Sequence, residues 1–146
     1  MWCYTASFAF GENMSTGYQS KFQRQNQLAR LAKDLVRRSR SKCELCDLGG
    51  SRLQVYELLP LPEEPTVEGC VFICDACLKQ LTHPKKMIPS HWRCLNNALW
   101  SEVPAVQALS FRILKRLIAL DQHWAEELLE HAYLDPDVED WALSSE

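Results

Sequence analysis

The chain has 146 residues, of which 47% are hydrophobic and 24% are charged, and its formal net charge is −3. This length is typical of one compact domain, and the composition excludes a wholly disordered chain. A net charge so close to zero neither favours nor excludes a polyanionic partner. The local distribution of charge is therefore the informative feature.

Seven cysteines are present, and an odd number cannot pair completely within one chain. No apolar run approaches the roughly 20 residues of a membrane-spanning helix, and the N-terminus lacks the pattern of a secretion signal. We therefore expect a cytoplasmic protein that makes no membrane contact. Reduced cysteines in that compartment more often bind metal than form disulfides.

Residues 1–20 show no helical period and include Met14, an alternative start of translation. We expect this segment to be a flexible leader outside the fold, in which Cys3 is a bystander. The first predicted structural element follows directly after it.

A basic amphipathic helix is predicted over residues 21–40, because apolar residues recur there at helical spacing. Residues 21–42 hold eight Lys or Arg residues against one acid, a charge of +7. The candidate contacts to nucleic-acid phosphates are Arg30, Lys33, Arg37, Arg38 and Arg40. Two alternatives stay open: the helix docks on an acidic protein partner, or residues 121–146, with nine acids and no Lys or Arg, neutralise it.

A metal-binding module is predicted over residues 41–84 and a helical region over residues 85–146. In the module, residues 53–56 and 70–73 read as two short strands joined by a proline-rich loop. In the helical region, Ser101 is the expected cap of a helix reaching about residue 120, with Pro104 in its first turn. The expected buried stripe of this helix consists of Val103, Val106, Leu109, Ile113, Leu114 and Leu117. Asp121 is the expected cap of the next helix, and residues 135–141 form a last turn or two.

Two Cys-x-x-Cys pairs, Cys43 with Cys46 and Cys74 with Cys77, are the most specific signal in the sequence. Two such turns can present four sulfurs to one zinc ion at about 2.3 Å, and a closed four-thiolate shell is typical of structural zinc. Iron and a thioredoxin-like dithiol are the alternatives, but two pairs around a predicted hairpin favour zinc. We therefore predict a structural Zn²⁺ held by these four cysteines.

For the other candidate groups we prefer a role in packing to a role in binding or catalysis. Cys70 fits a buried strand position better than a ligand position. His91 and Cys94 lie three residues apart, which suits one helical face, but one histidine and one cysteine do not make a site. We therefore expect Cys94 to pack in the core. A cluster of aromatic residues is expected to pack in the core rather than to form a platform for bases; its members are Trp92, Trp100, Trp124 and Tyr133.

The order of cysteine turn, hairpin and second cysteine pair opening a helix resembles a treble-clef finger, and residues 53–60 invite comparison with HNH nucleases. In those enzymes a histidine of this strand is the catalytic base. Here Glu57 occupies that position, and Leu78 follows the second cysteine pair where the nucleases often have histidine. The likeness is therefore to the scaffold and not to the nuclease.

A closer resemblance is to the PhnA family of zinc-ribbon proteins, of the N-terminal proteobacterial type, named for an alkylphosphonate-utilisation operon. It is carried by residues 41–46 (SKCELC), 74–77 (CDAC) and 91–107 (HWRCLNNALWSEVPAVQ), and it covers roughly residues 30–143. Longer relatives add a C-terminal SH3-like β-domain, and this chain is expected to lack it. The resemblance implies a zinc site and a link to phosphonate metabolism through gene context.

Some relatives carry the label phosphonoacetate hydrolase, and cleavage of a carbon–phosphorus bond needs a nucleophile or open metal ions. The four histidines do not have the spacing of a two-metal ligand set; they are His83, His91, His123 and His131. We therefore expect an α+β protein, a treble-clef or zinc-ribbon-like module with a short hairpin packed on a mostly helical C-terminal half. Its predicted function is that of a non-catalytic zinc-binding accessory protein with an unknown protein partner. Sequence-independent nucleic-acid binding and phosphonate hydrolysis are the two alternatives.

Overall fold

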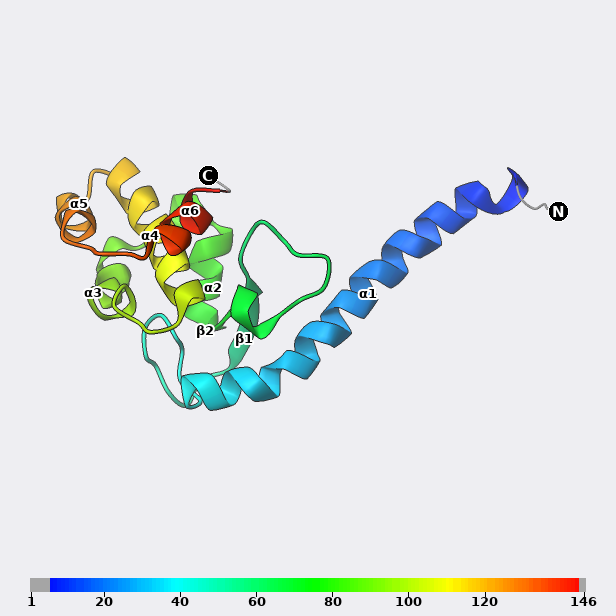
Figure 1. The fold of residues 1–146 in the computed structure, drawn as a ribbon, viewed down its shortest axis with the longest axis horizontal. Coiled ribbons are helices and arrows are strands. Elements are labelled where there is room, and N and C mark those ends of the chain that lie inside the picture. The colour runs from blue at the N-terminus through cyan, green and yellow to red at the C-terminus, as the bar shows by residue number, and fades with distance from the viewer. Residues whose placement is uncertain (1–5, 145–146) are drawn as a thin grey trace.

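The computed structural model describes the backbone of residues 6–144 and the side chains of residues 21–144, and it combines helices with one two-stranded antiparallel sheet (Figure 1). The expected α+β class is confirmed at this level. The elements in chain order are α1 (Ala6–Ser39), β1 (Leu53–Glu57), η1 (Val67–Gly69), β2 (Cys70–Cys74), α2 (Asp75–Thr82), η2 (Pro84–Lys86), η3 (Pro89–Cys94), α3 (Leu95–Ala98), α4 (Pro104–Ala119), α5 (His123–Glu130) and α6 (Pro136–Leu143).

Helix α1 is much longer than the sequence indicates, because it begins at Ala6 and its N-terminal part projects away from the rest of the molecule (Figure 1). Residues 6–20, which were expected to belong to a flexible leader outside the fold, have a helical backbone in the structure. Once a helix has started, each further residue adds one backbone hydrogen bond, which favours extension of the helix.

The C-terminal end of α1 lies where it was predicted. Arg40 and Ser41 have positive φ angles of 58° and 62°, which the helix cannot continue through. The amide of Ser41 donates to the carbonyl of Val36, five residues earlier, at 3.1 Å, and hydrogen bonds of this kind end many helices. The chain thus turns sharply into the first cysteine pair.

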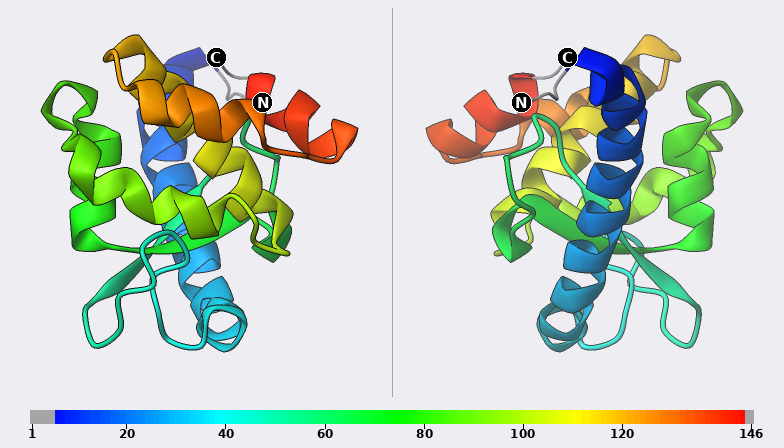
Figure 2. Two further views of the ribbon diagram at one scale, coloured as in Figure 1. Left: turned by 90° about the vertical axis from the view of Figure 1, so that its left-hand side faces the viewer. Right: turned by 90° about the vertical axis from the view of Figure 1, so that its right-hand side faces the viewer.

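The hairpin is sandwiched between α1 and the helical half of the molecule (Figure 2). Its strands pair antiparallel with Val55 opposite Phe72, and all five residues of β2 are buried. Because side chains alternate along a strand, Cys70 and Phe72 pack with Leu35 of α1, whereas Val71 and Ile73 join the main core. Cys70 is thereby confirmed as a core residue, and burial raises the pKa of its thiol to about 11.

The centre of the helical half is α4, and α5 and α6 pack against it. The predicted buried stripe of this helix is confirmed, except that Val103 precedes the helix and is half-buried; the fully buried members are Val106, Leu109, Ile113, Leu114 and Leu117. Trp92 is fully buried in the same core.

Two predicted helix caps are wrong. Helix α4 begins at Pro104, and Ser101 Oγ accepts a hydrogen bond from the Val103 amide at 3.1 Å, one turn before the helix proper. Gln122 rather than Asp121 precedes α5, because Asp121 takes a positive φ of 62° in the connecting turn. The final helix, by contrast, begins as predicted, where Asp135 accepts from the Asp137 amide at 3.1 Å.

A buried arginine ties the proline-rich loop to the helices. Arg112 of α4 donates to the carbonyl of Leu59 at 2.5 Å and to those of Trp141 and Ala142 at 2.7 and 3.0 Å. Its positive charge lies at the C-terminal end of α6, where the helix dipole favours a cation. Among the described helices, none is both long enough and apolar enough to cross a membrane.

Candidate metal centre

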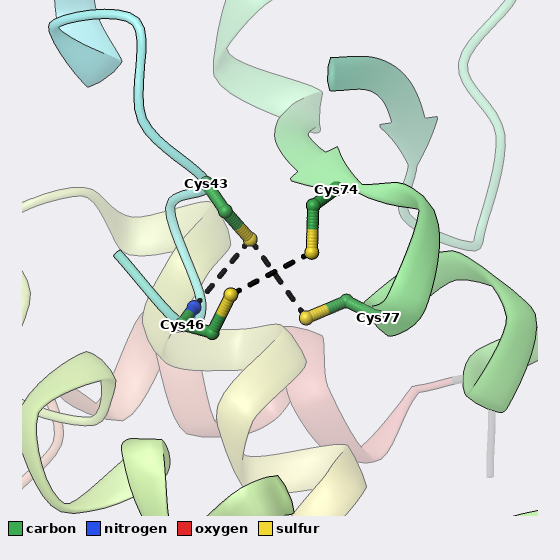
Figure 3. Close-up of side chains that lie close together, drawn as sticks. All are labelled: Cys43, Cys46, Cys74 and Cys77. Atoms are coloured by element: carbon green, nitrogen blue, oxygen red, sulfur yellow. Dashed lines mark hydrogen bonds between the residues drawn. The ribbon is translucent and has the colours of Figure 1, made fainter. Parts of the chain in front are cut away.

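Four cysteine side chains from two distant parts of the chain converge between α1, the hairpin and α2 (Figure 3). Cys43 and Cys46 lie in a tight turn that is closed by hydrogen bonds from the Cys43 amide to the Leu48 carbonyl and from the Asp47 amide to the Cys43 carbonyl. Cys74 ends β2 and Cys77 lies in the first turn of α2. The Glu44 amide of the first cysteine turn donates to the Phe72 carbonyl of β2 at 2.9 Å, and this hydrogen bond holds the two pairs together.

The four Sγ atoms lie within 4.8 Å of one another. The Sγ atoms of Cys43 and Cys77 are 3.8 Å apart, and those of Cys46 and Cys74 are 3.6 Å apart. An ion about 2.3 Å from four tetrahedrally placed sulfurs separates them by about 3.8 Å. The cluster therefore has the dimensions of a four-thiolate metal site, and the predicted ligand set is brought together in full.

The surroundings of the sulfurs push their pKa values apart. The hydrogen bond with Cys77, helped by backbone amides that include the Cys46 N–H at 3.4 Å, lowers the pKa of Cys43 to about 5. Burial raises the pKa of Cys46 to about 12, and the hydrogen bond with Cys43, together with burial, raises the pKa of Cys77. A metal that binds here near neutral pH must therefore displace protons.

His91 contacts this centre, which the sequence did not indicate. Its Nε2 atom lies 3.2 Å from the Sγ atom of Cys77, although three-residue spacing had suggested Cys94 as its partner. Burial lowers the pKa of His91, and burial raises that of the half-buried Cys94 to about 12. Cys94 packs against the main core as predicted. No local motif could have shown the contact, because α2 and η3 meet only in the folded chain.

Two arginines of α1 hold this helix against the metal-binding module. Arg24 makes two hydrogen bonds with the Glu57 carboxylate at 2.7 and 2.8 Å. Arg38 does the same with Glu44 at 2.7 and 2.9 Å, and Glu44 lies between Cys43 and Cys46 in the first cysteine turn. Glu57, which stands where nucleases carry a base, is thus bound in an ion pair.

Arg38 is therefore directed inward, away from the position expected of a nucleic-acid contact. The other four candidates are exposed: Arg30, Lys33, Arg37 and Arg40. Arg37 makes one exposed ion pair with Asp34 at 4.0 Å. Among the described residues, the ion pairs of α1 are with Asp34, Glu44 and Glu57, and none is with residues 121–144. The alternative that the acidic C-terminal helices neutralise the basic face of α1 therefore finds no support in this part of the chain.

The aromatic residues do not share one environment. Trp92 is buried as predicted, but Trp100 is 51% exposed and Tyr133 is 89% exposed, so the expectation of core packing is wrong for these two. Trp124 is half-buried, and the Arg93 guanidinium lies over its ring at 4.4 Å. A single stacking platform made by all four is excluded because Trp92 is inaccessible.

Comparisons of the chain with family models, with curated proteins and with solved structures found no match. The resemblance to the PhnA family therefore remains a prediction that depends on the sequence motifs of this chain.

Proposed function

We propose that the protein is a non-catalytic zinc-binding interaction protein, in which one Zn²⁺ held by Cys43, Cys46, Cys74 and Cys77 organises the fold. The observation that carries the proposal is the spacing of the four sulfurs, 3.6 and 3.8 Å across the two recorded pairs. Thiolates in a tetrahedral arrangement suit zinc, which has no geometric preference of its own and occurs most often in such sites.

The donor set supports a structural rather than a catalytic ion. Catalytic zinc keeps one coordination position for water or substrate, whereas four protein sulfurs fill the tetrahedron. Three of the four cysteines are buried, and only Cys46 is half-exposed. What zinc supplies here is therefore a cross-link between the turn after α1 and the hairpin–α2 unit.

The order of elements around the sulfurs supports a treble-clef or zinc-ribbon relationship of the PhnA type. A cysteine turn is followed by an antiparallel hairpin, and the second pair opens a helix at Asp75. The link to phosphonate metabolism would then reflect gene context. Helix α1, held to the module by Arg24 and Arg38, presents exposed side chains along residues 21–39, and this is the surface on which we expect a macromolecular partner to bind.

Matched cysteine variants test the zinc proposal. Cys46→Ser and Cys94→Ser each replace a half-buried cysteine, but only Cys46 belongs to the converging set. Metal analysis of the purified proteins should give one zinc per chain for the wild type and for Cys94→Ser, and loss of zinc for Cys46→Ser. Equal zinc content in the two variants would refute the ligand assignment.

Nucleic-acid binding is the second candidate, and the placement of three cations favours it. Apolar Leu28, Leu31 and Leu35 define the packed face of α1, and at about 100° per residue Arg30, Lys33 and Arg37 fall on the opposite face. If these three and Arg40 contact phosphates, log–log plots of affinity against salt should have a slope near −3.6.

A charge-matched comparison separates this candidate from general electrostatics. The triple variant Arg30→Gln, Lys33→Gln, Arg37→Gln removes three charges from the outer face of α1. The control, Lys85→Gln, Lys86→Gln, Lys115→Gln, removes three exposed charges elsewhere on the molecule. Binding to single- and double-stranded DNA and RNA should fall, and the salt slope should flatten by about 2.7, only in the first variant. Equal losses in both, or no binding by the wild type, would eliminate the candidate.

A further inference from the structure

We propose that His91 is a positioning residue of the metal centre, which donates its Nε2–H to the thiolate of Cys77. The inference rests on the proposed zinc site and adds a fifth residue to it. The Nε2 atom lies 3.2 Å from Cys77 Sγ, a normal length for a hydrogen bond to sulfur. The two residues are fourteen positions apart and come from different elements, η3 and α2, so the contact is a product of the fold.

His91 is placed to act on a ligand rather than as one. Four ligand atoms lie within 4.8 Å of one another, and the ring nitrogens of His91 are not among them. Four sulfurs already complete the tetrahedron that zinc prefers. The imidazole therefore lies outside the ligand set, where histidine can only donate to or accept from the bound sulfur.

The ring is held in place by its neighbour in sequence. His91 and Trp92 make an edge contact with centroids 4.9 Å apart and planes at 89°. Trp92 is fully buried in the main core. The core thus fixes the direction in which the imidazole presents its N–H, and the hydrogen bond needs no ordering when metal binds.

Charge explains why this donor matters. Four thiolates and one Zn²⁺ carry a net charge of −2, and hydrogen bonds to the sulfurs spread that charge. The Cys46 amide donates to Cys43, and His91 provides the corresponding bond for Cys77. Cys77 has 0% exposure, so water cannot replace the N–H if the imidazole is removed. Loss of such a partner typically weakens metal binding by about 10–100-fold.

Two substitutions separate the hydrogen bond from the packing of the ring. His91→Phe keeps an aromatic ring against Trp92 and removes the donor, whereas His91→Gln offers an amide N–H near the position of Nε2. His131→Phe is the control, because His131 is exposed directly after α5 and its ring Nδ1 atom lies 2.8 Å from the Glu127 carbonyl, away from the cysteine cluster. Zinc affinity is measured by competition with a chromophoric chelator, and the sulfur-to-metal charge-transfer bands are recorded after substitution with Co²⁺.

We expect His91→Phe to bind zinc about tenfold or more weakly, with the charge-transfer bands moved to longer wavelength, because an unbonded thiolate lone pair is higher in energy. His91→Gln should recover part of both effects, and His131→Phe should match the wild type. Wild-type affinity and spectra in His91→Phe would overturn the inference while leaving the zinc proposal intact. A Co²⁺ spectrum of the wild type with nitrogen ligation would also overturn it, and a wild type that binds no metal would overturn both proposals.

Discussion

The ion pair between Arg38 and Glu44 offers a sharp test of how α1 is attached to the metal-binding module. Besides its two bonds to Glu44, Arg38 donates to the carbonyl of Val67 at 3.0 Å and to that of Cys70 at 2.7 Å. Glu44 also accepts from the Phe72 amide at 2.8 Å, and its side chain is only 6% exposed. The pair thus joins the helix, the first cysteine turn and β2.

The substitution Arg38→Ala should be costly because it leaves the Glu44 carboxylate buried with one remaining hydrogen bond. Breaking a buried pair by removing one partner costs about 3–5 kcal/mol, and the 20% exposure of the Arg38 side chain places the expected loss near the lower value. Arg37→Ala is the matched control, since its side chain is 69% exposed and its contact with Asp34 spans 4.0 Å. We expect that control to change the free energy of unfolding by no more than about 0.5 kcal/mol.

Urea unfolding of the zinc-saturated proteins measures both values, and a double-mutant cycle with Glu44→Ala isolates the pair. The cycle should give a coupling energy of about 1–3 kcal/mol between Arg38 and Glu44. Equal destabilisation by Arg38→Ala and Arg37→Ala would refute the reasoning, because it would mean that burial and bidentate geometry contribute nothing. A coupling energy near zero would contradict it equally.

Further predictions concern the packing of α1 and the protons of the metal centre. Leu35 of α1 is fully buried against β2, so Leu35→Ala should lower the free energy of unfolding by about 3 kcal/mol. Val36→Ala, at a position 38% exposed, should lower it by less than about 1 kcal/mol. Similar losses for the two variants in urea unfolding would mean that α1 does not pack there. Zinc affinity should fall as the pH falls, by more than about tenfold per pH unit between about pH 6 and pH 8. The reason is that burial raises the pKa of Cys46 to about 12, and that protons compete with the metal for this sulfur and for that of Cys77. Competition titrations in buffers across this range measure the slope, and a pH-independent affinity would contradict the assignment.

The cysteine turns were predictable because their information is local. A Cys-x-x-Cys spacing presents two sulfurs on one side of a turn whatever follows, and short apolar runs on either side of a proline-rich loop marked both strands. The hairpin, the helix opened by the second pair and the stripe of α4 were all found in the structure for that reason. Zinc as the bound ion stays a prediction.

The distinction among the cations of α1 was available in the sequence but was missed. Arg24 and Arg38 lie on the same helical face as Leu28, Leu31 and Leu35, at spacings of three and four residues. Charged residues in line with an apolar stripe face the core and need a buried partner. The two acids that serve them, Glu44 and Glu57, lie in the cysteine turn and in β1, and only the fold brings them there.

The remaining errors have separate physical causes. The predicted caps at Ser101 and Asp121 failed because turn geometry before each helix moved the cap position by two residues, to Val103, and by one residue, to Gln122. The contact of His91 with Cys77 joins two helical elements whose relative placement no local pattern encodes. The helical path of residues 6–20 escaped notice because hydrophobic periodicity reports packing, and this part of α1 extends beyond the body of the molecule.

The most direct test of the central claim is hydrogen exchange of the purified protein, read by mass spectrometry, before and after its metal is removed with a chelator. We predict one zinc per chain, and on its removal a loss of protection across residues 43–82, because the binding energy of structural zinc is comparable to the whole stability of a small domain. Protection should return when zinc is added back. A protein that is metal-free as purified and yet shows full protection of that segment would contradict the account.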